Sequence, residues 1–204
     1  MPNNSPDPSL VGLRLFAHPL RLRLLSLLTG GAMSAAEAAR ELGETQANVS
    51  YHMRRLHQGG LLELAEEVSV SGGRARRYRH NPDSGPAATA AAPPATRDEH
   101  RLLVEALAAE LHRRTDRRRT EVPGHFTDAE VWIPAEEWAA LRAAFDALGA
   151  RVHGCALPPR SPGAVHLSAS LLLFQMAGSD GAADGTADRA GDSATGPSGG
   201  EDAP

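Results

Sequence analysis

Leucines recur with helical spacing in the first third of the chain, and pairs of glycines interrupt them. Leu20, Leu24 and Leu27 follow one face of a helix. Pro19 suits the first position of that helix, because the missing N–H of proline has no intrahelical partner to lose there. A Gly-Gly pair at residues 30–31 is typical of a helix end. The pattern therefore predicts a first helix that begins at Pro19 and ends at this pair.

Two shorter helices are predicted to follow, separated by a tight turn. The segment Ser-Ala-Ala-Glu that ends at Glu37 is a capping box, in which the serine and the glutamate each satisfy a backbone N–H of the other. It predicts a helix over residues 35–42, which Gly43 ends. Thr45 can cap the next helix, over residues 46–58. Two short helices joined by a short turn that contains glycine form a helix-turn-helix signature.

The second of these helices has an apolar face and a polar face, and a hairpin follows it. Val49, Met53 and Leu56 form the apolar stripe. The residues that point most directly away from this stripe are Ala47, Tyr51, Arg54 and Gln58. Beyond another Gly-Gly pair, a strand-like run over 61–70 leads to a glycine tip and a return strand over 74–79. This pattern predicts a β-hairpin.

The second half of the chain predicts a long helix and a small mixed module. Residues 97–119 carry a stripe of leucines, and both contact with a second subunit and packing within the same subunit remain open for it. Residues 126–133 have the composition of a strand, a helix runs from Pro134 to Gly149, and residues 165–173 alternate as a strand. The aromatic residues of this strand–helix–strand module fit a packed core best, and use of the module as a dimer contact or an effector site remains open.

The predicted fold class is therefore mainly α with a small β component. A winged helix-turn-helix comes first, followed by the long helix and the strand–helix–strand module. Composition divides the chain into a disordered N-terminus (1–9), the winged helix-turn-helix domain (10–81), a Pro/Ala linker (82–96), a dimerisation or effector region (97–177) and a disordered acidic tail (178–204).

Charge is distributed unevenly, although the net charge of the chain is only −4. Residues 10–82 hold 10 arginines against 6 glutamates, a balance of +4, whereas residues 178–204 hold 1 arginine against 6 acids, a balance of −5. A basic front part with an acidic tail favours nucleic acid as a partner. The polar start of the chain and its short apolar runs predict neither a signal peptide nor a membrane span, and hence a soluble, cytoplasmic protein.

The outward face of the 46–58 helix carries side chains suited to the major groove of DNA. Asn and Gln pair with adenine edges, Arg with guanine, and Ser with a base or a phosphate. We expect the residues near the bases to be Gln46, Ala47, Asn48, Ser50 and Tyr51, and those nearer the phosphates to be Arg54 and Arg55. The hairpin would add Arg74, Arg76 and Arg77, with Arg79 beside them, against the phosphate backbone or the minor groove.

The stretch from Leu15 to Asn81 resembles the winged helix-turn-helix of the ArsR/SmtB-type bacterial transcription regulators. The segments that carry the resemblance are Ala17–Leu25, Gln46–Leu56, Gly60–Leu62 and Gly73–Tyr78, and residues 49–56 are the most specific part. It covers about a third of the chain. The resemblance implies a homodimer, operator binding through the helix around Ser50 and Tyr51, and usually repression. His18 stands where that family often has an acidic cap.

We therefore expect a homodimeric repressor that binds a palindromic operator in double-stranded DNA and is released by a small molecule or another signal. The alternative is a winged-helix module that contacts a protein partner without binding DNA specifically. No nucleophile–base motif, phosphate-binding glycine loop or recognisable carboxylate pair indicates an enzyme, and we expect no cofactor and no membrane contact.

A metal site is not predicted either. Asp98, His100 and His112 are superficially similar to one ligand pattern of metal-sensing members of that family. However, the twelve positions between the two histidines turn about 120° around a helix, whereas eleven would turn only about 20°. Cys155 is the only cysteine, so an internal disulfide and a cysteine-cluster metal site are excluded.

Overall fold

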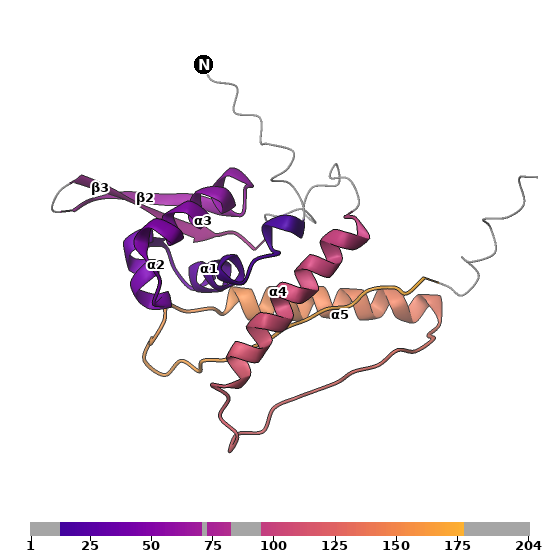
Figure 1. Cartoon of the computed structure of the whole chain (residues 1–204). Helices are drawn as coiled ribbons and strands as arrows, with labels where there is room; N and C mark the ends of the chain where they lie inside the picture. The colour runs from indigo at the N-terminus through magenta and orange to yellow at the C-terminus, as the bar shows by residue number, and fades with distance from the viewer. Residues whose placement is uncertain (1–12, 71–72, 83–94, 178–204) are drawn as a thin grey trace, which may run out of the picture. The chain divides into compact units, whose positions relative to one another are not determined.

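The computed structural model describes residues 13–70, 73–82 and 95–177 (Figure 1). Its elements are η2 (Leu13–Leu15), α1 (Pro19–Thr29), β1 (Met33–Ser34), α2 (Ala35–Leu42), α3 (Gln46–Gln58), β2 (Leu62–Val70), β3 (Gly73–His80), α4 (Arg97–Thr115) and α5 (Ala135–Gly154). The chain divides into two compact units, 1–171 and 172–204, and all of these elements lie in the first. The fold class is mainly α with a small sheet, as predicted. The expected disordered ends and most of the expected linker lie outside the described residues.

Helix α1 begins as predicted, with Pro19 at its first position and His18 as its cap. The Nδ1 atom of His18 accepts a hydrogen bond from the backbone N–H of Leu20 at 3.2 Å. An imidazole nitrogen therefore takes the capping role that the resemblance assigns to a carboxylate, and it does so without a negative charge.

Helices α2 and α3 also begin and end where the sequence predicts. Ser34 Oγ accepts from the N–H of Glu37 at 3.3 Å, and Glu37 Oε2 accepts from the N–H of Ser34 at 2.7 Å, which completes the capping box. Gly43 ends α2 with a left-handed φ of 67°, a conformation that glycine adopts without a steric penalty. The side chain of Thr45 then caps α3. The turn between the two helices is therefore specified locally.

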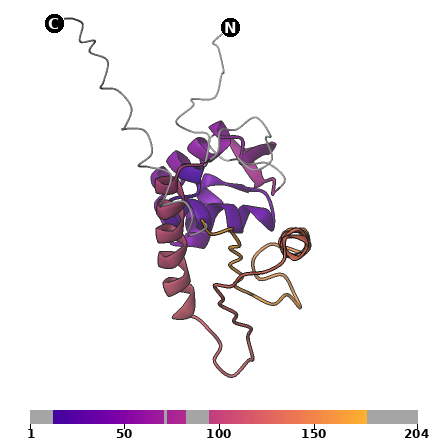
Figure 2. The same ribbon diagram turned by 90° about the vertical axis from the view of Figure 1, so that its right-hand side faces the viewer.

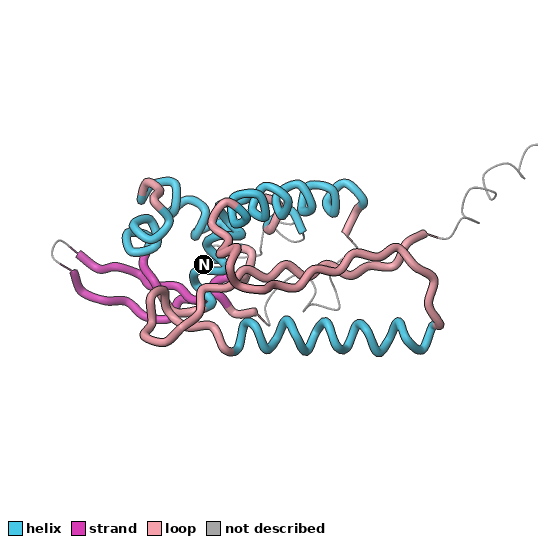
Figure 3. Tube along the Cα trace, turned by 90° about the horizontal axis from the view of Figure 1, so that it is seen from below, coloured by secondary structure: helices cyan, strands magenta, loops and turns pink. Residues whose placement is uncertain are grey.

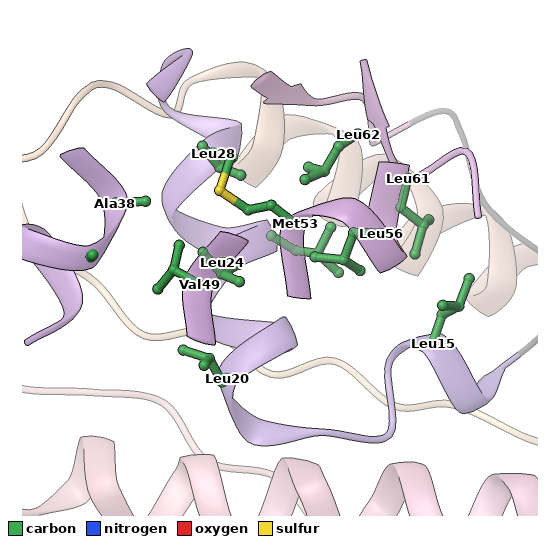
Figure 4. Close-up of a cluster of buried hydrophobic side chains, with 12 residues drawn as sticks. Leu15, Leu20, Leu24, Leu28, Ala38, Val49, Met53, Leu56, Leu61 and Leu62 are labelled. Carbon is green, nitrogen blue, oxygen red and sulfur yellow. The ribbon is translucent and has the colours of Figure 1, made fainter. Parts of the chain in front are cut away.

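Helices α1, α2 and α3 share one apolar core (Figure 4). The predicted stripe of α3 lies in this core, because Val49 and Leu56 are completely buried and Met53 is almost so. The core consists of Leu15, Leu20, Leu24, Leu25, Leu28, Ala38, Ala39, Val49, Met53, Leu56, Leu61 and Leu62. Burial of one side of α3 fixes which side faces outward.

A three-stranded antiparallel sheet in the order β1-β3-β2 completes the domain. The predicted hairpin is confirmed, and it extends away from the helices in Figure 1; we call β2 and β3 the wing. Its register runs from Leu62 opposite His80 to Val70 opposite Gly73. Strand β1 was not predicted, because two residues that pair with a strand more than 40 positions away leave no local pattern.

Helix α4 packs against η2 and α1 (Figure 2). Its buried residues are Ala106 and Glu110, and the Glu110 carboxylate forms an ion pair with Arg113 at 2.7 Å. The predicted leucine stripe is thus only partly covered within the chain. The helix ends at Thr115 rather than at Arg119, because the arginines that follow would stand four positions apart as like charges.

The two strands predicted in the second half are wrong. Residues 126–133 and 165–173 have no regular secondary structure, and only α5 forms between them. A strand needs a neighbour to pair its backbone groups, and neither segment pairs with another strand in the part of the chain that the structure describes. Phe126 and Trp132 are 92% and 90% exposed. An alternating pattern of side chains therefore does not produce a sheet when no partner strand is available.

Helix α5 is longer than predicted, and Figure 3 shows it without a break. It continues through Gly149 to Gly154, because a glycine inside a helix costs only about 1 kcal/mol and the residues around it favour a helix. None of its residues is buried. Among the described residues, no helix combines the length and the apolar character that crossing a bilayer requires.

Candidate nucleic-acid interface

The outward side of α3 exposes the side chains that were predicted to meet DNA. We define the recognition face as Gln46, Ala47, Asn48, Ser50, Tyr51, Arg54 and Arg55. All seven lie on one helix, five of them exposed and two, Ser50 and Arg55, half-buried. Tyr51 is the largest exposed side chain of the set, with 52% of its surface accessible. The predicted outward orientation is therefore confirmed, whereas contact with DNA stays a prediction.

Local hydrogen bonds orient two members of the recognition face. The Asn48 amide donates to Glu44 Oε2 at 3.4 Å, and Glu44 is itself held by Arg23 at 3.0 Å. Arg54 Nε donates to the carbonyl of Ser50 at 3.3 Å, one turn earlier in the same helix. Both contacts are long, so a base or a phosphate can replace them at small cost.

The recognition face is positively charged and lacks acids. Helix α3 contains Arg54 and Arg55 but no Asp or Glu. Within the described residues, neither of these arginines forms an ion pair, and the same is true of Arg21 on α1. Guanidinium groups without a carboxylate partner can accept a phosphate without first losing an ion pair.

The wing carries more arginines, but acids of the same hairpin neutralise them. Arg74 and Arg76 both pair with Glu67, each at 2.9 Å. Arg79 lies 3.9 Å from Glu63. The hydrogen bond from Arg76 to Glu67 is the main reason that the pKa of Arg76 is raised. Arg74 and Arg76 remain largely exposed, so they can still turn toward a nucleic acid.

Arg77 differs from the other wing arginines because it is partly buried among protein groups. It contacts Glu66 at 2.6 Å, Glu37 at 3.2 Å and the carbonyl of Ala32 at 2.7 Å. The pKa of Glu37 is lowered first by the N–H of Ser34 and, to a smaller extent, by Arg77. Arg77 therefore joins the wing to the start of α2, a role that sequence spacing did not reveal.

A contact beside the recognition face also escaped the sequence analysis. The ring of His52, on the buried side of α3, lies 4.4 Å from the ring of His18 between centroids, and Arg21 lies close by on α1. A signal for His52 existed, because it stands three positions after Val49 and directly before Met53 on the apolar stripe. Nothing in the spacing paired it with α1.

Two of the three residues considered for a metal, Asp98 and His100, have other contacts. Asp98 pairs with Arg101 at 3.4 Å, and the His100 ring contacts the carbonyl of Thr96 at 3.0 Å. The part of the chain that the structure describes holds no group of three or more His, Cys, Asp or Glu side chains placed to share a metal ion. Cys155 is exposed at the end of α5.

Comparison with known proteins bears on the N-terminal domain alone. A family described as a helix-turn-helix domain matches residues 16–65, which span α1 to the first part of β2. No curated protein matches the chain. Together with the wing-like hairpin, the match shows a helix-turn-helix domain with a wing. Such domains bind DNA in transcription regulators and are generally not enzymes.

Proposed function

We propose that this protein is a sequence-specific transcription regulator of the ArsR/SmtB type, a homodimeric repressor that a small molecule or another signal releases from DNA. The observation that carries the proposal is the recognition face, which is exposed, rich in hydrogen-bonding groups and free of acids. The helix-turn-helix match supports it. A regulator of this kind works in the cytoplasm, where the bacterial DNA lies.

In this proposal α3 enters the major groove with its N-terminal end toward the bases. Gln46, Ala47, Asn48, Ser50 and Tyr51 contact base edges, and Arg54 and Arg55 contact phosphates. Arg74 and Arg76 of the wing reach the backbone or the minor groove. We assign Arg77 mainly to holding the wing in place, because its three contacts are all within the protein.

The region from 97 to 177 is proposed to join two subunits and to sense the signal. Its support is apolar surface that the single chain leaves open, such as Leu102 and Leu111 on α4 and Trp132 after it. A two-fold dimer predicts an operator with two half-sites about 34 Å apart, one helical turn of DNA, or a multiple of that.

Fluorescence anisotropy tests the proposal. The full chain is titrated with DNA from upstream of its own gene and with a shuffled duplex of equal length, at several salt concentrations. We expect tighter binding to the upstream DNA and a logarithm of affinity that falls steeply with the logarithm of salt concentration. Absence of binding to either duplex at low salt would overturn the proposal and support the protein-partner alternative.

A further inference from the structure

A cavity of about 290 Å³ lies where the beginning of α1 meets α3. Its lining is cationic and polar: His18, Arg21, Tyr51, His52 and Arg55. None of these five residues carries a negative charge at neutral pH. Two of them, Tyr51 and Arg55, also belong to the recognition face, so the cavity adjoins the surface proposed to meet DNA. We call it the α1–α3 cavity.

Two buried polar atoms of this lining have no partner. Neither Arg21 Nε nor His52 Nδ1 forms a hydrogen bond within the described residues, and His52 is only 8% exposed. Buried polar groups of folded proteins are nearly always paired, so each exception asks for an explanation. An anion in the cavity would stabilise the charge of the Arg21 guanidinium, which has no carboxylate partner in the described part of the chain.

We propose that the α1–α3 cavity binds one phosphate group of the DNA backbone, with Arg21 and Arg55 as its main ligands. The inference rests on the proposed function and adds α1 to the DNA interface. A phosphate at the rim of the groove is the anion closest to a recognition helix, and such contacts fix the register of that helix on the duplex. The first N–H groups of α1 add positive potential beside it.

The electrostatics of the cavity fit an anion. Burial lowers the pKa of Arg21, and the neighbouring charge of Arg55 lowers it further, although Tyr51 opposes this. Burial, His18 and Arg21 together lower the pKa of His52 to about 4, while Glu44 opposes this. Two cations that destabilise one another gain from an anion placed between them.

The two histidines have unequal freedom to take up a proton. His18 Nδ1 accepts the hydrogen bond from Leu20, so the neutral ring carries its proton on Nε2. His52 Nδ1 has no such partner among the described residues. A bound phosphate raises the pKa of His52, and its affinity therefore increases as the pH falls below the pKa of the bound state and toward that of the free state.

The first arm of the test measures DNA affinity as a function of salt for Arg21→Ala. We expect binding to weaken about tenfold on upstream and shuffled DNA alike, and the salt slope to fall by about 1. Arg21→Lys should restore the slope but only part of the affinity, because it keeps the charge and loses the planar fork. Arg101→Ala, which removes an exposed cation of α4, is the matched control and should change neither. An unchanged slope for Arg21→Ala, with the fold intact by circular dichroism, would overturn the proposal.

The second arm works without DNA and separates this inference from the proposed function. Inorganic phosphate is titrated into the full chain while the ring signals of His18 and His52 are followed by NMR. We expect both to shift in the wild type and not in Arg21→Ala, and the upstream DNA to displace the phosphate. Phosphate that binds but is not displaced by bound DNA would overturn the assignment to the backbone and favour a free phosphorylated ligand. Absence of any shift at 100-fold excess over the protein, together with normal DNA binding by Arg21→Ala, would exclude the site while leaving the regulator intact.

Discussion

The arginines of α3 and those of the wing differ in whether acidic side chains pair with them. Helix α3 holds two arginines and no acid, and neither arginine is ion-paired within the described residues. The wing holds four arginines, but Glu63, Glu66 and Glu67 stand on the facing strand and pair with them. By the number of arginines alone, the wing would be expected to contribute more to DNA binding than α3. By the number of arginines without an ion pair, α3 would be expected to contribute more.

The difference shows what an arginine contributes to DNA binding. An unpaired guanidinium gains a phosphate and releases a counterion, whereas a paired one exchanges a carboxylate for a phosphate and leaves that carboxylate near the backbone. Exposed ion pairs are worth at most about 1 kcal/mol, so the exchange is feasible. A paired arginine nevertheless contributes less to the affinity for DNA, and less to the salt dependence of binding, than an unpaired one.

The largest effect on DNA binding is expected at the recognition helix. Arg54→Ala should weaken operator binding by roughly 1–3 kcal/mol, because it removes from the recognition face an exposed cation that has no ion pair among the described residues. Fluorescence anisotropy on the upstream duplex measures the loss, and Arg142→Ala on α5 serves as a control for charge alone. If Arg54→Ala binds as tightly as the wild type, Arg54 does not belong to the interface.

A second substitution separates anchoring from binding within the wing. Arg77→Ala should lower the free energy of unfolding by about 1–3 kcal/mol, because it leaves the carbonyl of Ala32 without its side-chain partner and removes the ion pair that Glu37 forms with the wing. Arg79→Ala, whose ion pair is longer at 3.9 Å, should change stability by less than about 0.5 kcal/mol. Urea unfolding measures both. Equal losses for the two variants would contradict the anchoring role of Arg77.

Each region also contains a buried histidine, which predicts a pH dependence of stability. Burial is the main cause that lowers the pKa to about 4 both for His52 of α3 and for His80 at the end of β3. In the unfolded chain histidine titrates near pH 6.5, so the unfolded state binds more protons between these two values. The free energy of unfolding should therefore fall as the pH decreases from 6.5 toward 4, by on the order of 2 kcal/mol for each of the two histidines.

Urea unfolding of the wild type at pH 7.0 and pH 4.5 checks this dependence. His80→Gln should make it about half as steep, because a neutral amide cannot take up a proton in either state while His52 still titrates. The matched control is His125→Gln, a change at an exposed histidine, which should leave it unaltered. A dependence that is just as steep in His80→Gln would show that other groups cause it.

The smallest expected effect on DNA binding comes from removing an acid of the wing. It tests most directly whether ion pairing weakens the contribution of the wing arginines. Glu67→Gln removes the acid that pairs with both Arg74 and Arg76. We expect DNA binding to tighten by about two- to fivefold and its salt slope to become steeper, because two wing cations lose their internal partner. The control is Glu105→Gln on α4. A weaker or unchanged affinity in Glu67→Gln would mean that the wing arginines do not face the DNA.

Signals within a few residues allowed most of the N-terminal domain to be predicted. The capping box at Ser34, the left-handed Gly43 and the apolar stripe of α3 are all local, and each of them formed as expected. The same stripe fixed which side chains of the recognition face point outward. Local rules sufficed because one core satisfies all of these signals at once.

What the sequence could not supply depends on distant partners. Arg77 has the spacing of an ordinary wing arginine, and only the folded chain brings it to Glu37, 40 positions away. The cavity beside His52 likewise needs α1 and α3 together. The strands expected at 126–133 and 165–173 did not form, because a strand also depends on a distant partner. Their alternating pattern is local, but neither segment pairs with another strand in the part of the chain that the structure describes.

The Oε2 atom of Glu37 accepts three hydrogen bonds, from two different parts of the fold. It accepts from the N–H of Ser34 at 2.7 Å, from the hydroxyl of Ser34 at 2.8 Å and from Arg77 Nε at 3.2 Å. The same oxygen therefore sets where α2 begins and where the wing attaches. Grafting this hairpin onto another helix-turn-helix scaffold would require the Ser34–Glu37 capping box as well, because without it the wing loses the contact that fixes it to α2.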